Sequence, residues 1–137
     1  MSNQPTLFTY MCDLKYVTDG DTVRLSWVDL GFSMKLHNVA VRIAEIDTPE
    51  SRINLKRYPE RTAEKELGLK AKARLKELLV GDVRLQSLER DKYGRVLGHL
   101  FVDGINVSDI LIKEGLACPY YGKTKQARVR EDGTWGV

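Results

Sequence analysis

The chain has 137 residues, of which 42% are hydrophobic and 30% charged, and its formal net charge is +3. This size and composition predict one globular domain, over residues 1–137, with a single core. No apolar run is long enough to span a membrane, and the start of the chain lacks the basic and apolar regions of a signal peptide. We therefore expect no membrane partner, a monomer, and a cytoplasmic location unless a leader was removed.

The first half of the chain predicts three strands. Residues 14–17 are expected to close a first strand, and residues 23–27 alternate between apolar and polar as a half-buried strand does. After a turn at residues 31–33, a third strand is predicted from about residue 36 to residue 46. Pro49 ends it, because proline cannot donate to a strand ladder.

The periodicity changes after Pro59, where apolar residues recur at steps of three and four. That spacing is typical of the core stripe of an amphipathic helix, and Gly81 fits just past its end. The stripe consists of Ala63, Leu67, Ala71, Leu75 and Leu78.

The rest of the chain predicts two more strands and a short helix. A period of two restarts at residues 83–85, and a turn at residues 91–94 leads to a strand over residues 95–102. Ser108 is a good N-cap for a short helix that Gly115 stops. Three strands, a helix, two strands and a helix predict a mainly β (α+β) fold, a five-stranded OB-fold barrel with two helices.

Basic residues are concentrated in two runs. From Arg52 to Lys76, nine basic residues stand against three acidic ones. Either run alone is more typical of a solvated helix face or tail than of a binding surface, although the net charge favours a polyanionic partner. The second run consists of Lys123, Lys125, Arg128 and Arg130.

The two cysteines, Cys12 and Cys118, have neither the spacing of a metal site nor that of a redox pair. Such residues are more typical of small buried hydrophobic side chains than of a disulfide. We expect both to be buried and reduced.

Three short stretches combine residues that can carry chemistry: residues 19–22, 42–50 and 91–95. If the second and third strands form a hairpin, Asp21 and Asp47 lie at the same end of the sheet. Two neighbouring carboxylates repel unless a cation joins them. Oxygen ligands without a nearby His or Cys indicate a hard ion such as Ca²⁺ or Mg²⁺.

Asp19 brings a third carboxylate to this end, and crowding of the three is expected to cost about 1 kcal/mol per close pair without metal. Arg42 precedes Asp47 by five residues, so an ideal strand would place them on opposite faces, and convergence needs a bulge or strong curvature. The guanidinium of Arg42, in an apolar strand, also needs a partner, which a bound phosphate would supply.

Each stretch alone has a simpler interpretation. An Asp-Gly-Asp sequence is usually a turn, residues 47–50 could merely end a strand, and residues 91–95 are typical of a hairpin turn. Tyr93, Tyr120 and Tyr121 are individually more typical of core or surface residues than of stacking platforms. Their occurrence together, in this order and spacing, is improbable by chance.

Together these stretches resemble the staphylococcal (micrococcal) nuclease family, also called thermonuclease, from about Tyr10 to Ala117. The resemblance implies a Ca²⁺-dependent enzyme that hydrolyses phosphodiesters of DNA and RNA, cleaves the 5′ P–O bond and leaves 3′-phosphates. It also implies a preference for single-stranded or breathing regions. The alternative is a catalytically silent OB-fold nucleic-acid-binding module, which predicts gaps among key positions that are all filled here.

The resemblance assigns roles to individual positions. It implies metal ligation by Asp21, Asp47 and the backbone carbonyl of Thr48, with Asp19 supporting the site through water. It implies that the catalytic residues are Arg42, Glu50 and Arg95. The positions that resemble nucleotide-binding residues are Lys92, Tyr93, Tyr120 and Tyr121.

Two features depart from the family pattern. The best-known member ends in a longer helical segment, whereas residues 123–137 have no helical stripe. Glu45 places an extra carboxylate in the predicted third strand beside the metal motif, where it either faces solvent or alters the metal preference.

Overall fold

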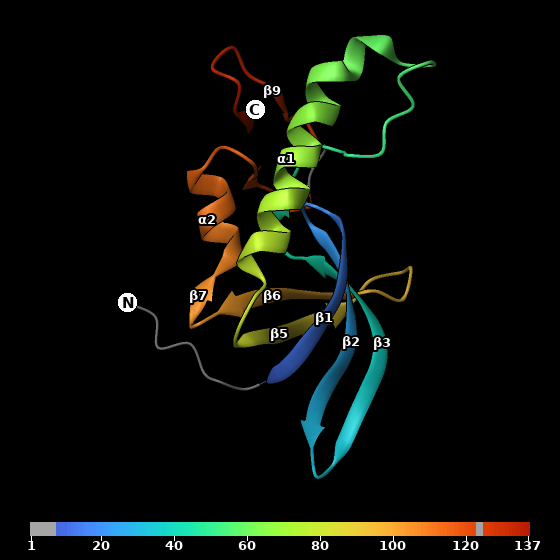
Figure 1. Ribbon diagram of the computed structural model, residues 1–137, viewed down its shortest axis with the longest axis vertical. Helices are drawn as coiled ribbons and strands as arrows, with labels where there is room; N and C mark the ends of the chain where they lie inside the picture. Colours follow the sequence, from blue (N-terminus) through green and yellow to red (C-terminus); the bar gives the residue numbers. More distant parts are fainter. Residues whose placement is uncertain (1–7, 123–124) are drawn as a thin grey trace.

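The computed structural model describes residues 8–122 and 125–137. A strongly bent antiparallel sheet runs in the order β3-β2-β1-β5-β6, and β3 also pairs with β6 in parallel, which closes the ring (Figure 1). The predicted five-stranded barrel with two helices is confirmed. The barrel strands are β1 (Thr9–Asp19), β2 (Thr22–Gly31), β3 (Met34–Ile43), β5 (Val83–Arg90) and β6 (Val96–Val102).

Alternation of buried and solvent-facing residues explains why these segments form a barrel. On β2, Val23 and Leu25 are buried, and on β3 so are Val41 and Ile43. Strands buried on one face must close over a shared core, here completed by β5 and β6. Register shifts along the β1–β2 pair supply the local bends that closure requires.

Two helices cover one end of the barrel. A short 3₁₀ turn, η1 (Pro59–Arg61), leads into α1 (Thr62–Leu78), which buries Leu67, Ala71 and Leu75 as the stripe predicts. The helix α2 (Val107–Lys113) follows the short strand β7 (Ile105–Asn106) and packs beside α1 (Figure 1).

The predicted N-cap of α2 at Ser108 is wrong. Asn106 has an extended backbone, and its side-chain oxygen accepts a hydrogen bond from the Ser108 backbone N–H at 3.0 Å. Ser108 is therefore already inside the helix, and the asparagine two residues earlier is the cap. Gly115 follows the helix with φ 76°, as expected of a residue that stops it.

The predicted third strand is too long. β3 ends at Ile43, a turn follows at residues 44–45, and the chain re-enters extended structure only in β4 (Ile46–Asp47). Glu45 has φ 66°, so it lies in this turn and not in the strand. This turn is the bend that allows Arg42 and Asp47 to face the same region although they are five residues apart.

The C-terminal segment forms a small hairpin in place of a helix. β4 pairs with β8 (Cys118–Pro119), and β9 (Arg128–Val129) pairs with β10 (Trp135–Gly136). Trp135 is buried against Leu67 of α1, so the hairpin closes over the helix. Of the second basic run, Lys123 lies outside the described residues.

Both cysteines are free and buried, as expected. Burial is the main cause that raises the pKa of Cys12 to about 12, and it also raises the pKa of Cys118, with Asp47 contributing. Neither thiol is therefore a reactive nucleophile near neutral pH. No helix in the described parts of the chain is long and apolar enough to cross a membrane.

Candidate active site

The register of β2 and β3 sets the first part of the site. Thr22 pairs directly with Arg42, and the backbone carbonyl of Asp21 accepts a hydrogen bond from Ile43 N–H at 2.8 Å. Arg42 Nη2 lies 3.4 Å from Asp21 Oδ2, and both side chains are largely buried. Strand pairing alone therefore brings an arginine against the aspartate of the β1–β2 turn.

Arg42 also fixes the turn that follows its strand. Its Nη1 donates to the carbonyl of Ile43, and its Nη2 donates to that of Ile46 at 2.9 Å. The guanidinium thus stabilises the bend through which the chain passes from β3 to β4. This geometry supplies the partners that a buried arginine requires.

Residues 48–51, here called the strap, cross from β4 toward α1. Three of the four strap residues are buried, and Glu50 is exposed. A Cβ built on Gly68 of α1 would lie 2.4 Å from the Glu50 carbonyl oxygen, and one built on Gly20 would lie 2.8 Å from Ala71 Cβ. The small residues of α1 therefore let the strap and the β1–β2 turn lie directly on the helix.

Asp19 holds the end of the strap. Its Oδ1 accepts hydrogen bonds from the Ser51 hydroxyl and, at 3.4 Å, from the Ser51 backbone N–H. Its Oδ2 pairs with Arg52 at 3.1 Å. Asp19 thus ties the β1–β2 turn to the strap.

Asp47 is buried, 4% exposed, and both its oxygens have partners from the C-terminal segment. Trp135 Nε1 donates to Oδ2 at 3.3 Å, and Lys125 Nζ lies 3.2 Å from Oδ1. The C-terminal hairpin therefore orients this aspartate from 88 residues away in sequence.

Glu50 points its carboxylate away from the protein interior. The side chain is 53% exposed, and its Oε2 lies 3.2 Å from Arg61 Nη2. Arg61 also pairs with Glu64 at 3.0 Å. The η1 turn that precedes α1 thus positions Glu50 while leaving the carboxylate open to water.

Arg95 is placed by the turn between β5 and β6. Its Nε donates to Asp91 Oδ2 at 2.7 Å, and Asp91 Oδ1 accepts backbone N–H groups from Tyr93 and Arg95. Partial desolvation acts to raise the pKa of Asp91, but these hydrogen bonds outweigh it and hold the pKa below its ordinary value. With Nε engaged, the two terminal nitrogens of Arg95 can receive an anion.

These side chains meet in one hollow of about 270 Å³, here called the acidic pocket. It combines carboxylates from the region of the β1–β2 turn and from the strap with the guanidinium groups of Arg42 on β3, Arg52 after the strap and Arg95 in the β5–β6 turn. The predicted site residues that line it are Asp19, Asp21, Arg42, Thr48, Glu50 and Arg95. Asp47 is joined to this pocket through Lys125, which lines it.

The expected crowding of three carboxylates is wrong. Among the described residues, no three His, Cys, Asp or Glu side chains form a metal-type cluster. Each of the three aspartates has a cation beside it instead, so their repulsion is neutralised within the protein. The pairs are Asp19–Arg52, Asp21–Arg42 and Asp47–Lys125.

The donor set still fits a hard cation. Within the described parts of the chain, Thr48 Oγ1 is buried without a hydrogen-bond partner. Thr48 lines the acidic pocket together with Asp21, and it directly follows Asp47 of β4. An orphaned buried oxygen in a pocket lined by carboxylates suits Ca²⁺, which accepts six to eight oxygen ligands including carbonyls and water.

A second hollow of about 720 Å³, the tyrosine pocket, adjoins the first at Arg42, Arg95 and Lys125. Tyr93 and Tyr121 are 73% and 72% exposed, as stacking platforms would be. The four predicted nucleotide-binding residues all line it: Lys92, Tyr93, Tyr120 and Tyr121. Glu45 lines the same pocket and not the acidic pocket, 3.8 Å from His99.

Sequence reasoning missed three residues that hold the site. Gly68 could have been noticed as a glycine inside an amphipathic helix, where it needs a packing reason. Asp91 belongs to the stretch of residues 91–95, but the sequence suggested only that it starts a turn and not that it holds Arg95. Trp135 had no sequence signal, because its contact with Asp47 depends on how the tail folds back.

Comparisons with known proteins point to relatives of one kind. Residues 40–133 match the family described as Staphylococcal nuclease homologue. The chain is 35% identical over 111 residues to the SPbeta prophage-derived endonuclease YokF of Bacillus subtilis (strain 168), covering 76% of this chain and 32% of that protein. It is 34% identical over 103 residues to Endonuclease YncB of the same organism, covering 72% and 43%.

A third relative is a protein of Escherichia coli named Uncharacterized endonuclease, 31% identical over 106 residues that cover 76% of this chain and 57% of the relative. The chain therefore spans about one third to three fifths of the length of the relatives it matches.

Proposed function

The chain belongs to the staphylococcal nuclease family, and on that premise we propose that it hydrolyses phosphodiester bonds of DNA and RNA with Ca²⁺ as its cofactor. The observation that carries this proposal is the acidic pocket, in which Arg42, Arg95 and Glu50 line the same small hollow. That arrangement matches what phosphodiester hydrolysis requires, namely cations for the phosphoryl oxygens and a carboxylate for the attacking water.

The two arginines would bind the scissile phosphate from the barrel side. Negative charge accumulates on the phosphoryl oxygens as water attacks, so groups already fixed beside them bind the transition state more tightly than the substrate. Asp91 fixes Arg95 by its Nε, and the β3–β4 turn fixes Arg42 by two carbonyls. Both guanidinium groups are therefore held in place before substrate arrives.

Glu50 would act on the attacking water from the strap side, as general base or as its positioner. Its carboxylate is half-exposed and held at one oxygen by Arg61, which leaves the other oxygen for water. When the water attacks, its proton passes to this carboxylate, the bond between phosphorus and the 5′ oxygen breaks on the opposite side, and the 5′ oxygen takes a proton from solvent to become a hydroxyl. The products would carry 3′-phosphates.

Asp21, Asp47 and Thr48 are the residues that would hold Ca²⁺, with Asp19 supporting them through water. The bound ion would supply positive charge to a non-bridging oxygen and to the water. Trp135 and Lys125 orient Asp47 for this task.

The tyrosine pocket would receive the base next to the scissile phosphate. Stacking on exposed tyrosines is open to every base, which suits a nuclease without sequence preference that favours single-stranded or breathing regions. Lys92, whose Nζ lies 5.3 Å from the centre of the Tyr93 ring, would contact a neighbouring phosphate. We further propose that residues 1–137 act as one domain and as a monomer.

The test is digestion of plasmid DNA and of RNA with Ca²⁺, with Mg²⁺ and with excess chelator. We expect cleavage of both polymers with Ca²⁺ and none with chelator. Full activity in chelator would remove the metal from the proposal. Absence of cleavage with any ion, while the strands still bind, would support a silent binding module.

A further inference from the structure

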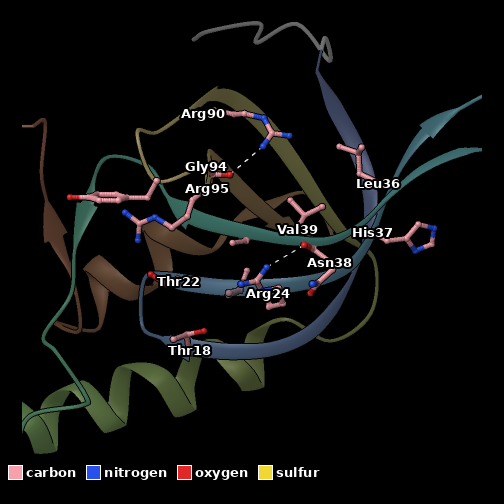
Figure 2. Close-up of a pocket in the computed structure, with 13 residues that line it drawn as sticks. Thr18, Thr22, Arg24, Leu36, His37, Asn38, Val39, Arg90, Gly94 and Arg95 are labelled. Atoms are coloured by element: carbon pink, nitrogen blue, oxygen red, sulfur yellow. Dashed lines mark hydrogen bonds between the residues drawn. The ribbon is translucent and has the colours of Figure 1, made fainter.

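A third hollow, about 650 Å³, lies beside the acidic pocket and the tyrosine pocket. It runs from β2 across β3 to the turn between β5 and β6, and we call it the hairpin groove. Figure 2 shows Arg24 on one side of β3 and Arg90 and Arg95 on the other. This placement follows from the sheet order, in which β3 lies between β2 and β6.

The groove is positively charged. Arg24, Arg90 and Arg95 line it, and none of the described residues that line it is an aspartate or a glutamate. Arg95 pairs with Asp91 beside the groove, but no lining carboxylate cancels the charge of Arg24 or Arg90. A groove of this charge attracts polyanions.

Arg24 and Arg90 differ from most other arginines of the chain. Arg24 Nη1 donates only to the Asn38 carbonyl at 3.2 Å, and Arg90 Nη1 donates only to the Gly94 carbonyl at 3.2 Å, within the described parts of the chain. A guanidinium has five N–H donors, so each retains donors for a phosphate. The arginines that instead pair with carboxylates are Arg42, Arg52, Arg61, Arg74, Arg84 and Arg95.

The hairpin groove is continuous with both other hollows. Arg95 lines all three, Thr22 lines the groove and the acidic pocket, and Tyr93 lines the groove and the tyrosine pocket. Thr22 is the register partner of Arg42, and Arg24 lies two residues further along β2. Two residues on a strand span about 7 Å. A nucleotide chain leaving the scissile phosphate can cover such a step.

We propose that the hairpin groove binds the sugar-phosphate backbone of a single-stranded polynucleotide on the side of the scissile phosphate opposite the tyrosine pocket. Arg24 and Arg90 each contact a phosphate there, and the exposed Tyr93 ring separates the two branches. The inference rests on the proposed function for the position of the scissile phosphate. It adds the surface on which the strand continues beyond the cleaved bond.

The test is binding of fluorescein-labelled single-stranded DNA in chelator, so that cleavage does not interfere. The probes are a strand of about twelve nucleotides, within the usual site size of such folds, and a dinucleotide. Each phosphate contact to a single strand contributes about 0.7 to the slope of log affinity against log salt. Arg24→Gln and Arg90→Gln should each lower that slope by about 0.7. Each variant should therefore bind the long strand about fivefold more weakly than the parent at 0.1 M salt, if the two proteins bind equally at 1 M salt.

The matched control is Arg84→Gln, which removes the same charge from an exposed arginine paired with Asp82, outside all three hollows. It should leave the slope unchanged. Ala40→Lys adds a cation beside Arg24 in the groove and should tighten long-strand binding about fivefold, a gain that misfolding cannot produce. The ratio of long-strand to dinucleotide affinity should fall in both arginine variants.

If the arginine variants match Arg84→Gln in slope and affinity, and Ala40→Lys does not tighten binding, the groove does not bind the strand. That result would leave the proposed nuclease activity untouched. Conversely, if the parent protein cleaves no nucleic acid but the variants change strand binding as expected, the nuclease proposal is refuted and the groove is retained as a binding site.

Discussion

The barrel side of the acidic pocket and its strap side are held in different ways. On the barrel side, Asp21 and Arg42 are brought together by the register of β2 and β3. On the strap side, residues 48–51 rest on Gly68 of α1, and Asp47 depends on Trp135. Neighbouring strands thus build one half of the site, whereas contacts remote in sequence build the other. Changes far from the chemistry should therefore disturb mainly the strap side.

The largest effect is expected on the barrel side. Arg42→Ala and Arg95→Ala should each lower kcat at least about a hundredfold, the usual scale for losing a preorganised transition-state donor. Arg95→Lys should be nearly as damaging, because a point charge does not reproduce the planar guanidinium. Steady-state kinetics on single-stranded DNA measure this. Near-normal turnover in both lysine variants, Arg42→Lys and Arg95→Lys, would reduce these arginines to substrate positioning.

Gly68→Ala should break the strap side from a distance. The new Cβ would lie 2.4 Å from the Glu50 carbonyl oxygen, so the strap must move. A displacement of about 1 Å can cost up to about a hundredfold in rate, and we expect a kcat loss of about tenfold or more. Alanine is the better helix former by about 1 kcal/mol, so propensity alone predicts stabilisation.

The control for Gly68→Ala is Leu69→Ala, which changes the exposed neighbour on the same helix. It should leave kcat unchanged. Equal kcat in the Gly68→Ala variant and the parent would show that the strap does not depend on this contact.

Trp135→Phe should have an intermediate effect. It keeps an aromatic ring against Leu67 but removes the N–H that donates to the buried Asp47. An acceptor that loses its partner costs about 1 kcal/mol or more in the free energy of unfolding, and activity at limiting Ca²⁺ should fall several-fold. Urea denaturation and a Ca²⁺ titration of activity measure the two effects. Trp27→Phe, at a half-buried position on β2, is the control that should leave the Ca²⁺ requirement unchanged.

The smallest effect is expected for Asp91→Asn, which loosens Arg95 without removing it. The folded-state pKa of Asp91 is lowered, so its contribution to stability is present above the ordinary pKa and is lost as the pH falls through the folded pKa. The variant should therefore be less stable than the parent near pH 7 and should approach it near pH 3. Urea denaturation at both pH values checks this, and a stability difference that grows at low pH would contradict it. The value of kcat/KM should fall a few-fold.

The contrast between the barrel side and the strap side also explains which features the sequence could predict. Apolar alternation and the amphipathic stripe predicted the barrel strands and α1, because those patterns follow directly from burial of one face. The pairing of β2 with β3 then predicted that Asp21 and Asp47 lie at the same end of the sheet.

Other features needed the folded chain. The positive φ of Glu45 ended β3 early, and a residue other than glycine gives little sequence signal for such a turn. The partners of the aspartates also escaped prediction, because Arg52 and Lys125 lie in segments without periodicity. The assumption that the carboxylates repel one another was therefore wrong.

The most direct test of the account is to compare Glu50→Gln with Glu45→Gln under saturating Ca²⁺, with kcat for single-stranded DNA as the measurement. Glu50 lines the acidic pocket beside the arginines, whereas Glu45 lines the tyrosine pocket in the β3–β4 turn. We predict that Glu50→Gln loses kcat by about a hundredfold, within the usual range for a general base, and that Glu45→Gln stays near the parent. A fully active Glu50→Gln variant beside an inactive Glu45→Gln variant would contradict the assignment of the catalytic carboxylate to the strap.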